Sequence, residues 1–485
     1  MEMTQFDKRN ISMMMDFYEL TMSNGYFQEN SENTKVVFDL FYRRNPDKGG
    51  FAVFAGLEQI IEYIENLHFS DHDISYLRSL SVFPEKFLEY LKNFKFTGDV
   101  YSFDEGTVIY PNEPVITVIA PLIEAQLIET VLLTQINHQT LIATKACRIV
   151  RAAKGRPVSD MGARRAHNID AAVYGARAAY IGGVENTATV LAGQLFNIPV
   201  IGTMAHSWIM FYDNEFDAFR RYAEIYGNST VLLVDTYDTI NSGIPNAIRI
   251  ANEILIPKGQ RLRGIRIDSG DIAYLSKKAR KMLDAAGLSD CKIIGSNSLD
   301  EQTITSILLQ GGCIDNFGVG ERLITAHSDS TFGAVYKLVA IEDGGVYHPK
   351  IKLSENIEKI TNPGIKRVYR VYNNNGQAIA DLITNEDEDI DQSKPYRYIS
   401  PAKPWQERYF KNCRFKELKK QIISNGKRIS EKRSLKEIRD FVKYQLENEI
   451  WEEEQRFENP HTHYLDMSPD YYNMKMNLLQ SHKSE

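Results

Sequence analysis

The stretch Arg266-Ile267-Asp268-Ser269-Gly270-Asp271 is the most informative part of this chain, because the apolar pattern changes within it. A short apolar run ends at Asp268, a polar glycine-containing loop follows, and residues 271–286 then have apolar positions at helical spacing. A buried strand, a polar loop and a helix in this order are typical of parallel sheets with crossover helices. The stretch therefore predicts an α/β fold.

The same pattern recurs on both sides of this stretch. Helical patterns at 187–196 and 299–310 separate some of the apolar runs. The repeat predicts an irregular (β/α) barrel-like domain over residues 131–339, although an open doubly wound sheet would produce a similar pattern. The apolar runs end near Asp160, Gly182, Thr203, Asp235, Asp268, Gly295 and Gly318, and residues 335–339 are a candidate eighth strand.

The regions before and after this repeat have different patterns. Alternating apolar residues at 36–41 predict a strand in a mixed N-terminal α+β domain, residues 1–130. Further strand patterns indicate that residues 340–400 complete this domain, which would make it split. For residues 401–485 we expect a C-terminal extension that is mostly helical, since 434–457 is a charged amphipathic pattern. We find no recognisable motif after residue 400.

The composition is that of an ordinary soluble protein of more than one domain: 485 residues, 43% hydrophobic and 25% charged. A net charge of −7 argues against nucleic acid or an anionic membrane as the main partner. No stretch approaches the roughly 18 apolar residues that span a bilayer, and residues 1–10 lack the apolar core of a signal peptide. The four scattered cysteines form no CxxC pair. We expect a soluble, cytoplasmic protein.

Polar residues follow each apolar run of the repeat. Because the carboxyl ends of parallel strands meet at one edge of a sheet, such residues converge there and predict an active site. Residues 295–297 and 318–320 contain glycines, whose backbone N–H groups can approach a phosphate closely, although tight turns would also select glycine. The polar segments are 159–165, 182–183, 202–207, 235–238, 266–271, 295–297 and 318–320.

Arg266, with Asp268 and Asp271, is the sharpest of these signals. A guanidinium binds a carboxylate or phosphate through two hydrogen bonds, and the two carboxylates suit ribose hydroxyls or Mg²⁺-bound water. An ion pair with a helix N-cap explains the same residues and does not compete with substrate binding. His206, just after a predicted strand end at Thr203, is also a candidate.

Several of these segments resemble the nicotinate phosphoribosyltransferase family. The resemblance extends in the family's order from about residue 10 to 340. It implies a type II phosphoribosyltransferase with an irregular α/β barrel and a split domain, acting as a homodimer with its active sites at the interface. The matching segments are 16–22, 139–145, 191–194, 202–207, 234–237, 266–271, 318–320 and 333–338.

The resemblance also implies substrates, cofactors and residue roles. The substrates would be nicotinate and phosphoribosyl pyrophosphate, with Mg²⁺ and with ATP as a co-substrate that phosphorylates His206; the ligands of the metal are not assigned. Asp235 and Asp268 would act with His206 in catalysis. Tyr18, Thr203, Arg266 and Met161 would bind nicotinate, and Asp16, Arg164, Asp271, Gly295, Ser296, Gly318, Gly320 and Glu321 would bind phosphate or ribose. From the residues alone, Asp16 only begins a helix and Tyr18 only packs.

Glu321 departs from the family, whose members often have a threonine after the Gly-x-Gly. A carboxylate beside phosphoryl oxygens is repulsive unless it turns away or meets a cation or Mg²⁺. The backbone of Gly318 and Gly320 is therefore a better phosphate-binding candidate than the Glu321 side chain.

Three other functions are compatible with parts of this pattern. A nicotinamide phosphoribosyltransferase shares the 266–271 motif, but amide-selective relatives have an acidic residue in the segment that corresponds to 186–190, where this chain has none. A sugar-phosphate aldolase or isomerase would need a lysine or a Glu–His pair at a strand end, and these strand ends are poor in lysine. A non-catalytic binding protein would keep the same loops without turnover.

Overall fold

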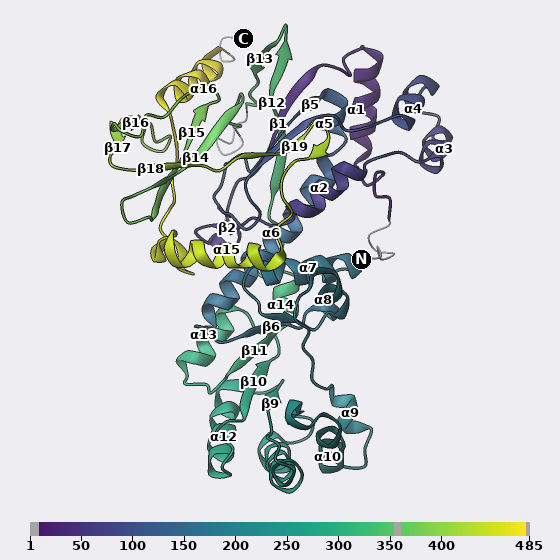
Figure 1. Cartoon of the computed structure of the whole chain (residues 1–485), viewed down its shortest axis with the longest axis vertical. Coiled ribbons are helices and arrows are strands. Elements are labelled where there is room, and N and C mark those ends of the chain that lie inside the picture. The colour runs from purple at the N-terminus through teal and green to yellow at the C-terminus, as the bar shows by residue number, and fades with distance from the viewer. Residues whose placement is uncertain (1–8, 354–359, 482–485) are drawn as a thin grey trace. The chain divides into compact units, whose positions relative to one another are not determined.

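The structure, a computed structural model, describes residues 9–353 and 360–481. The chain divides into two compact units: Met1–Leu141 with Thr331–Glu485, and Ile142–Ser330. The first boundary lies inside the long helix α6 (Glu129–Ala152). Figure 1 shows both units and labels their elements where there is room.

The second unit is built on a six-stranded sheet in the order β7-β6-β11-β10-β9-β8, with all of its strands parallel. Ile265 and Ile267 on β9, Ile293 on β10 and Phe317 on β11 are fully buried, as expected for parallel strands covered on both faces. The strands are β6 (Val158–Asp160), β7 (Asn186–Thr187), β8 (Val231–Leu233), β9 (Gly264–Ile267), β10 (Lys292–Ser296) and β11 (Asn316–Val319). The predicted parallel α/β organisation is confirmed.

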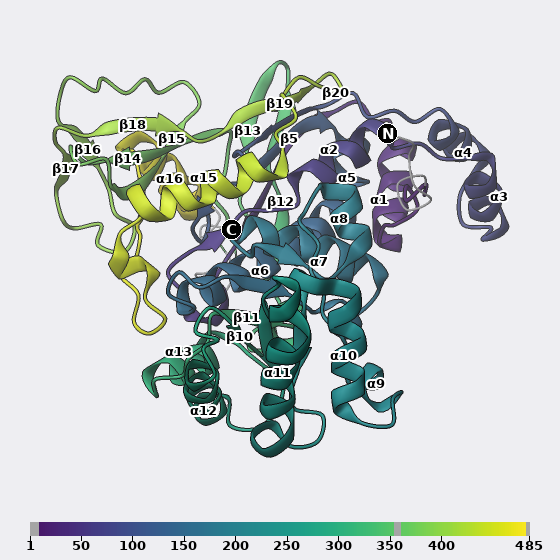
Figure 2. The same ribbon diagram turned by 60° about the horizontal axis from the view of Figure 1, so that its bottom comes forward.

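Crossover helices follow the strands of this sheet. Helix α12 begins after Asp271, whose side chain accepts a hydrogen bond from the backbone N–H of Tyr274. Its buried Ile272, Ala279 and Leu283 form the face that packs on β9 and β10 (Figures 1 and 2). The helices are α7 (Ile169–Ile181), α8 (Val190–Phe196), α9 (His206–Met210), α10 (Glu215–Tyr226), α11 (Ile244–Ile250), α12 (Ile272–Ala285), α13 (Glu301–Leu309) and α14 (Glu321–Ile324).

Three of the predicted barrel strands are wrong. The run ending near Gly182 is the alanine-rich helix α7, since short apolar runs do not distinguish a buried helix from a buried strand. The run before Thr203 forms only an isolated bridge between Val200 and Thr187. Residues 335–339 do form a strand, β12 (Ala334–Asp343), but it pairs antiparallel with strand β1 of the first unit. Among the described residues no ladder joins β7 to β8, so closure of a barrel stays a prediction.

The first unit contains a seven-stranded sheet, β13-β12-β1-β5-β3-β19-β20, and a four-stranded sheet, β18-β14-β15-β21. The strand predicted at 36–41 is confirmed as β1. The strands are β1 (Lys35–Tyr42), β2 (Ala52–Val53), β3 (Asp99–Ser102), β4 (Val108–Ile109), β5 (Ile116–Pro121), β12, β13 (Val346–Pro349), β14 (Lys366–Tyr372), β15 (Ala378–Asn385), β16 (Tyr396–Tyr398), β17 (Arg408–Phe410), β18 (Arg414–Glu417), β19 (Lys420–Ser424), β20 (Lys427–Arg428) and β21 (Leu465–Met467). The helices are α1 (Phe17–Gln28), α2 (Leu57–Asn66), α3 (Asp71–Ser79), α4 (Glu85–Lys92), α5 (Leu122–Gln126), the first part of α6, α15 (Leu435–Asn448) and α16 (Pro469–Ser481).

The C-terminal residues 401–485 are not mostly helical, which corrects our expectation. They contribute strands β17 to β21 as well as α15 and α16. β18 pairs with β14, and β19 pairs with β3, so these residues complete both sheets. The strands are short, and their apolar residues are buried by partners distant in sequence. Their alternation of apolar and polar residues is therefore too short to predict them from the sequence.

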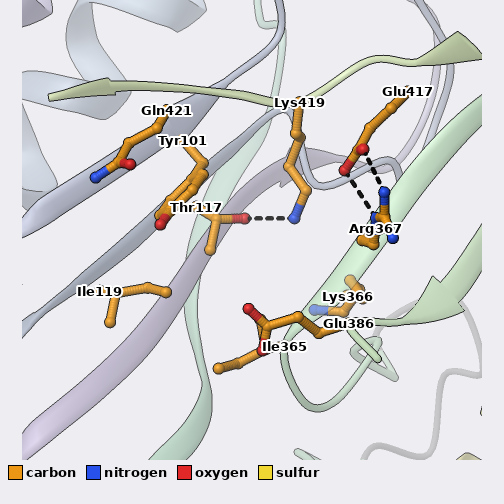
Figure 3. A pocket seen from close by; sticks show the side chains of 10 residues that line it. All are labelled: Tyr101, Thr117, Ile119, Ile365, Lys366, Arg367, Glu386, Glu417, Lys419 and Gln421. Carbon is orange, nitrogen blue, oxygen red and sulfur yellow. Dashed lines mark hydrogen bonds and ion pairs between the residues drawn. The ribbon is translucent and has the colours of Figure 1, made fainter. Parts of the chain in front are cut away.

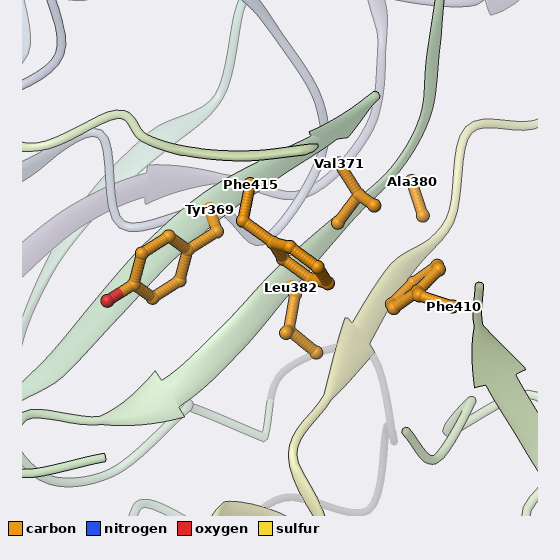
Figure 4. Packing of buried hydrophobic residues seen from close by; sticks show 6 residues of the cluster. All are labelled: Tyr369, Val371, Ala380, Leu382, Phe410 and Phe415. Atoms are coloured by element: carbon orange, nitrogen blue, oxygen red, sulfur yellow. The ribbon is translucent and has the colours of Figure 1, made fainter. Parts of the chain in front are cut away.

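Figure 4 shows how this packing works on one face of the four-stranded sheet. Tyr369 and Val371 on β14 lie opposite Leu382 and Ala380 on β15, and Phe415 on β18 lies opposite Val371. Facing side chains of paired strands share one side of the sheet, so together with Phe410 they form a buried apolar cluster.

No helix within the described residues is long and apolar enough to traverse a membrane.

Candidate active site

Asp235, two residues beyond β8, is the centre of a polar cluster in the second unit. Its side chain is only 1% exposed. One carboxylate oxygen accepts hydrogen bonds from the backbone N–H of Asp268 (2.9 Å) and from Ser269 Oγ (2.6 Å), and the other lies 3.3 Å from His206 Nε2. A buried carboxylate is stable only with such partners. Asp235 thereby joins the loops after β8 and β9 to the first residue of α9.

His206 is oriented by this carboxylate. Its side chain is 40% exposed, in contrast to that of Asp235. In the neutral tautomer that pairs with Asp235, Nε2–H donates to the carboxylate and Nδ1 keeps its lone pair. In this tautomer Nδ1, the ring nitrogen that is not paired with Asp235, is the nucleophilic one.

Arg266, on β9, forms the cationic part of the cluster. Its Nε donates to Ser296 Oγ (2.9 Å), one terminal nitrogen donates to Asp268 Oδ1 (2.9 Å), and the other donates more weakly to Thr203 Oγ (3.4 Å). Ser296 Oγ also donates to the same Asp268 oxygen. A guanidinium has five N–H donors, so this arrangement fixes its plane and leaves N–H groups for an anion.

The parallel register explains why these residues meet. Ile294 of β10 pairs with Arg266 of β9, and Gly295 pairs with Ile267, so Ser296 lies one step beyond at the carboxyl edge. Ser296 pairs with Gly318 on the other side. A Cβ on Gly318 would come within 2.7 Å of Met161 Sδ, so the absence of a side chain there makes room for Met161.

Gly295 and Gly320 have different surroundings. A Cβ on Gly295 would face Ile314 and Ile272, so this glycine allows helix α12 and its neighbours to pack. Gly320 precedes α14, and a Cβ there would meet the backbone of Met161. For Gly295 the packing accounts for the glycine without a phosphate; its predicted role in phosphate binding stays a prediction.

Glu321 turns toward a neighbouring loop. Its Oε1 accepts a hydrogen bond from Ser298 Oγ at 2.9 Å, and Arg322 forms an ion pair with Asp300 at 2.5 Å. These two contacts tie the loop after β10 to the start of α14. Ser298 has a positive φ of 44°, which a non-glycine residue adopts only when its surroundings hold it there.

The remaining predicted residues have contacts outside this cluster. Asp271 caps α12, and Arg164 is an exposed residue of a short 3₁₀ turn at 163–165. Asp16 and Tyr18 belong to the first unit, where Asp16 precedes α1 and its N–H donates to Thr130 Oγ (3.1 Å). Tyr18 is 43% exposed.

Asp160, at the end of β6, is a supporting residue that is not among those predicted from the sequence. Its buried carboxylate accepts hydrogen bonds from Thr187 Oγ (2.7 Å) and from the backbone N–H of Gly162 (2.9 Å). Burial raises the pKa of this carboxyl, which the two hydrogen bonds oppose. Asp160 therefore positions the turn that carries Met161. In the sequence, Asp160 could have been recognised as a site residue because it is the last residue of an apolar run.

Comparison with known proteins identifies the family. A model of the nicotinate phosphoribosyltransferase N-terminal domain matches residues 13–137, one of the family matches 157–387, and one of its C-terminal domain matches 365–475. A curated nicotinate phosphoribosyltransferase of Bacillus subtilis is 46% identical over 482 residues, covering 99% of this chain and 97% of that protein. This chain belongs to the nicotinate phosphoribosyltransferase family.

Two further similarities are to animal proteins. The nicotinate phosphoribosyltransferase of Caenorhabditis elegans is 34% identical, with 95% of this chain and 92% of that protein covered. The crystal structure of human nicotinic acid phosphoribosyltransferase superposes with a TM-score of 0.84 at 26% identity, covering 96% of this chain and 100% of that chain. The chain is thus an enzyme of the nicotinate phosphoribosyltransferase family. The similarity extends over nearly its whole length and includes the residues after 400, which contain no motif that we recognised in the sequence.

Proposed function

We propose that this chain forms nicotinate mononucleotide and pyrophosphate from nicotinate and phosphoribosyl pyrophosphate, a step of NAD salvage. The observation that carries the proposal is the single cluster that joins Arg266, Asp268 and Ser296 to Asp235 and His206 at the carboxyl edge of the parallel sheet. Relatives that are 46% and 34% identical to this chain bear the name of this activity. The direct test is detection of nicotinate mononucleotide by mass spectrometry after incubation with both substrates and Mg²⁺.

Arg266 is the residue we assign to the nicotinate carboxylate. Ser296 and Asp268 hold its guanidinium in place, and its remaining N–H groups can donate to two carboxylate oxygens at once. Thr203 and Met161 would border the nicotinate site. Thr203 contacts Arg266, and Met161 lies against Gly318, which pairs with Ser296. Bound in this way, the pyridine nitrogen is the free nucleophile of the substrate.

The chemical step is displacement of pyrophosphate at the anomeric carbon of the ribose. The bond from the pyridine nitrogen to carbon forms while the bond to the pyrophosphate oxygen breaks, and positive charge develops on the sugar. Asp268 has one carboxylate oxygen without a hydrogen-bond partner among the described residues, and its side chain is 28% exposed, so it can accept from a ribose hydroxyl or a metal-bound water. Mg²⁺ bound to the pyrophosphate would neutralise its charge.

The protein itself contributes mainly orientation to this step. Asp235 holds the Asp268 backbone and Ser269, so the loop after β9 keeps its geometry when substrates bind. Positioned reactants lose little further entropy on reaching the transition state. No covalent bond between the protein and the sugar is required.

We assign coupling to ATP to His206. Its Nδ1 lone pair would attack the γ-phosphorus of ATP, forming a nitrogen–phosphorus bond as the bond to ADP breaks, while Nε2–H stays paired with Asp235. Binding of substrates and release of products would then depend on the phosphorylation state of this side chain.

Replacement of His206 by alanine tests this coupling. We expect loss of ³²P transfer from γ-labelled ATP to the protein and loss of the stimulation of turnover by ATP, because the imidazole nitrogen that would accept the phosphoryl group is removed. The basal reaction without ATP should persist, since Arg266 and Asp268 are unchanged. Labelling of the His206→Ala protein at the wild-type level would show that another residue is the acceptor.

We propose that the enzyme prefers nicotinate, the acid, to nicotinamide, the amide. Residues 186–190 contain no acidic side chain, and a carboxylate there would repel nicotinate but accept a hydrogen bond from an amide. Turnover of nicotinate and nicotinamide at equal concentration decides between them. A preference for nicotinamide would overturn the assignment of the substrate.

We further propose that the enzyme acts as a homodimer in which Asp16 and Tyr18 enter the active site of the partner subunit, with the Tyr18 ring against the pyridine. The start of the chain supports this, since Ile11, Met14 and Phe17 are exposed apolar residues close to Tyr18 in sequence, and such residues favour association. The exposed Tyr18 ring is free to stack on an aromatic ligand.

Mixing two inactive variants tests the shared site. Tyr18→Ala and Arg266→Met should each have little activity alone. Dimers exchanged between them should recover about a quarter of wild-type turnover, because half of the dimers are mixed and each mixed dimer has one intact site. Absence of recovery, with subunit exchange verified by tagged chains, would show that each site is built from one chain.

A further inference from the structure

A cavity of about 320 Å³ lies in the first unit, and none of the residues discussed above as candidates for catalysis lines it. Strands β3, β5 and β19 supply one wall and β14 and β18 supply another, together with the short segment between β18 and β19 (Figure 3). The volume is sufficient for a small organic molecule.

One wall of the cavity is a row of polar side chains across the seven-stranded sheet. Gln421 lies opposite Tyr101, Tyr101 lies opposite Thr117, and Thr117 lies opposite Asp39. Residues that face each other across paired strands are on the same side of the sheet. Ile119, two residues along β5 from Thr117, adds an apolar surface to the same side.

Most of the charges beside this wall are already compensated. Asp39 uses both carboxylate oxygens: one accepts a hydrogen bond from Thr117 Oγ (2.6 Å) and the other pairs with the fully buried Lys366. Arg367 donates two hydrogen bonds, at 2.7 and 3.1 Å, to the Glu417 carboxylate. Both of these cations are therefore neutralised by protein carboxylates.

Lys419 is the exception among the cations that line the cavity. Its Nζ donates one hydrogen bond to Thr117 Oγ (3.1 Å), and in Figure 3 its side chain extends into the cavity toward this hydroxyl. An ammonium has three N–H donors, so two are left. Among residues 9–353 and 360–481, no carboxylate oxygen lies within ion-pair distance of Lys419 Nζ.

We propose that this cavity binds a small organic monocarboxylate, which supplies the missing negative charge to Lys419. The carboxylate oxygens accept hydrogen bonds from Lys419 Nζ, and the apolar part of the ligand lies against Ile119, Ile365 and the Tyr101 ring. A single uncompensated ammonium matches one negative charge, while Glu417 and Glu386 on the lining disfavour a second. The site is independent of the proposed function, because its residues all belong to the first unit.

The electrostatics of the cavity agree with this assignment. Burial and the neighbouring Lys366 ammonium lower the pKa of Lys419 to about 8, against the opposing effect of Asp39, Glu417 and Glu386. An anion at Lys419 favours the charged form. Affinity should therefore be nearly constant between about pH 6 and pH 7 and fall about tenfold between pH 7 and pH 9, as the ammonium of the free protein loses its proton.

Calorimetric titration of the full-length protein with sodium butyrate at pH 7 tests the proposal. We expect Lys419→Met to weaken binding about tenfold or more, because a charge-assisted hydrogen bond is lost. Lys419→Arg should keep most of the affinity. The matched control is Lys420→Met, which removes an exposed lysine next in sequence, paired with Asp104, and should bind butyrate as the wild type does.

Several outcomes would overturn the assignment. Wild-type protein that does not bind butyrate at pH 7, or binding that is unchanged in Lys419→Met, contradicts it. Loss of binding in Arg266→Met but not in Lys419→Met would place butyrate in the other unit. Inorganic phosphate that binds at Lys419 more tightly than butyrate would refute the monocarboxylate class. The pH titration of the wild-type protein requires no variant, so it applies even if Lys419→Met fails to fold.

Discussion

Replacement of Arg266 by lysine should lower kcat/KM for nicotinate by about 10²- to 10⁴-fold, the effect of losing two charge-assisted hydrogen bonds. The guanidinium of Arg266 is held by Ser296 and Asp268 and still has N–H groups for a carboxylate. A lysine ammonium has one nitrogen, which cannot keep these contacts and also donate to two substrate oxygens. The measurement is steady-state turnover at saturating phosphoribosyl pyrophosphate.

Arg261→Lys is the matched control for this variant. Arg261 precedes the same strand β9 at its other end and also binds a carboxylate through two nitrogens, that of Asp290, but on the surface. The same chemical change there should leave kcat/KM within about twofold of wild type, because exposed pairs contribute little. If Arg266→Lys retained wild-type kcat/KM with its fold intact, nicotinate would not be bound by this guanidinium.

Replacement of Arg370 by methionine should lower the free energy of unfolding by about 3–5 kcal/mol, the usual effect of breaking a buried ion pair. Arg370 and Asp381 face each other across β14 and β15, are almost completely buried, and share two hydrogen bonds of 2.9 and 2.7 Å. Burial would raise the pKa of the Asp381 carboxyl, but the Arg370 guanidinium offsets this and holds the pKa well below its usual range. Without Arg370 the buried Asp381 carboxylate loses both of its hydrogen bonds from the guanidinium.

Urea unfolding of Arg370→Met and of Arg367→Met separates this effect from a general loss of charge. Arg367, three residues earlier on β14, makes an equivalent pair with Glu417, but both side chains are about one-third exposed. Its replacement should lower the free energy of unfolding by about 1 kcal/mol or less. Equal losses in the two variants would show that burial of the Arg370–Asp381 pair is not what stabilises the sheet.

The sequence predicted much of the second unit correctly. Five apolar runs, those ending near Asp160, Asp235, Asp268, Gly295 and Gly318, are strands of one parallel sheet. The alanine-rich run before Gly182 was taken for a strand and is helix α7, because its apolar residues are too continuous to show a period. The strands after residue 400 were missed because each is short and packs against partners far away in sequence.

The candidate site, like the fold, was predicted only in part from the sequence. Arg266, Asp268, Asp235, His206 and Ser296 were all expected at one edge, and the structure brings them together. The sequence could not show that Asp235 links His206 to the loop after β9, that Glu321 turns toward Ser298, or that Asp160 supports the turn at Met161. These are contacts between loops, and the pairing of the strands decides which loops lie side by side.

The order of residues along the chain by itself determined which side chains follow five of the parallel strands, the helices within 187–196, 271–286 and 299–310, and which family the chain resembles, because burial periodicity and motifs are local properties of a sequence. Only the tertiary structure decided that β12 joins the first unit, that the last strands complete its sheets, and that Lys419 faces a cavity in which no carboxylate of the described residues forms an ion pair with it. The physical reason is that strand pairing and charge compensation join residues hundreds of positions apart, and several alternative partners satisfy the same local pattern.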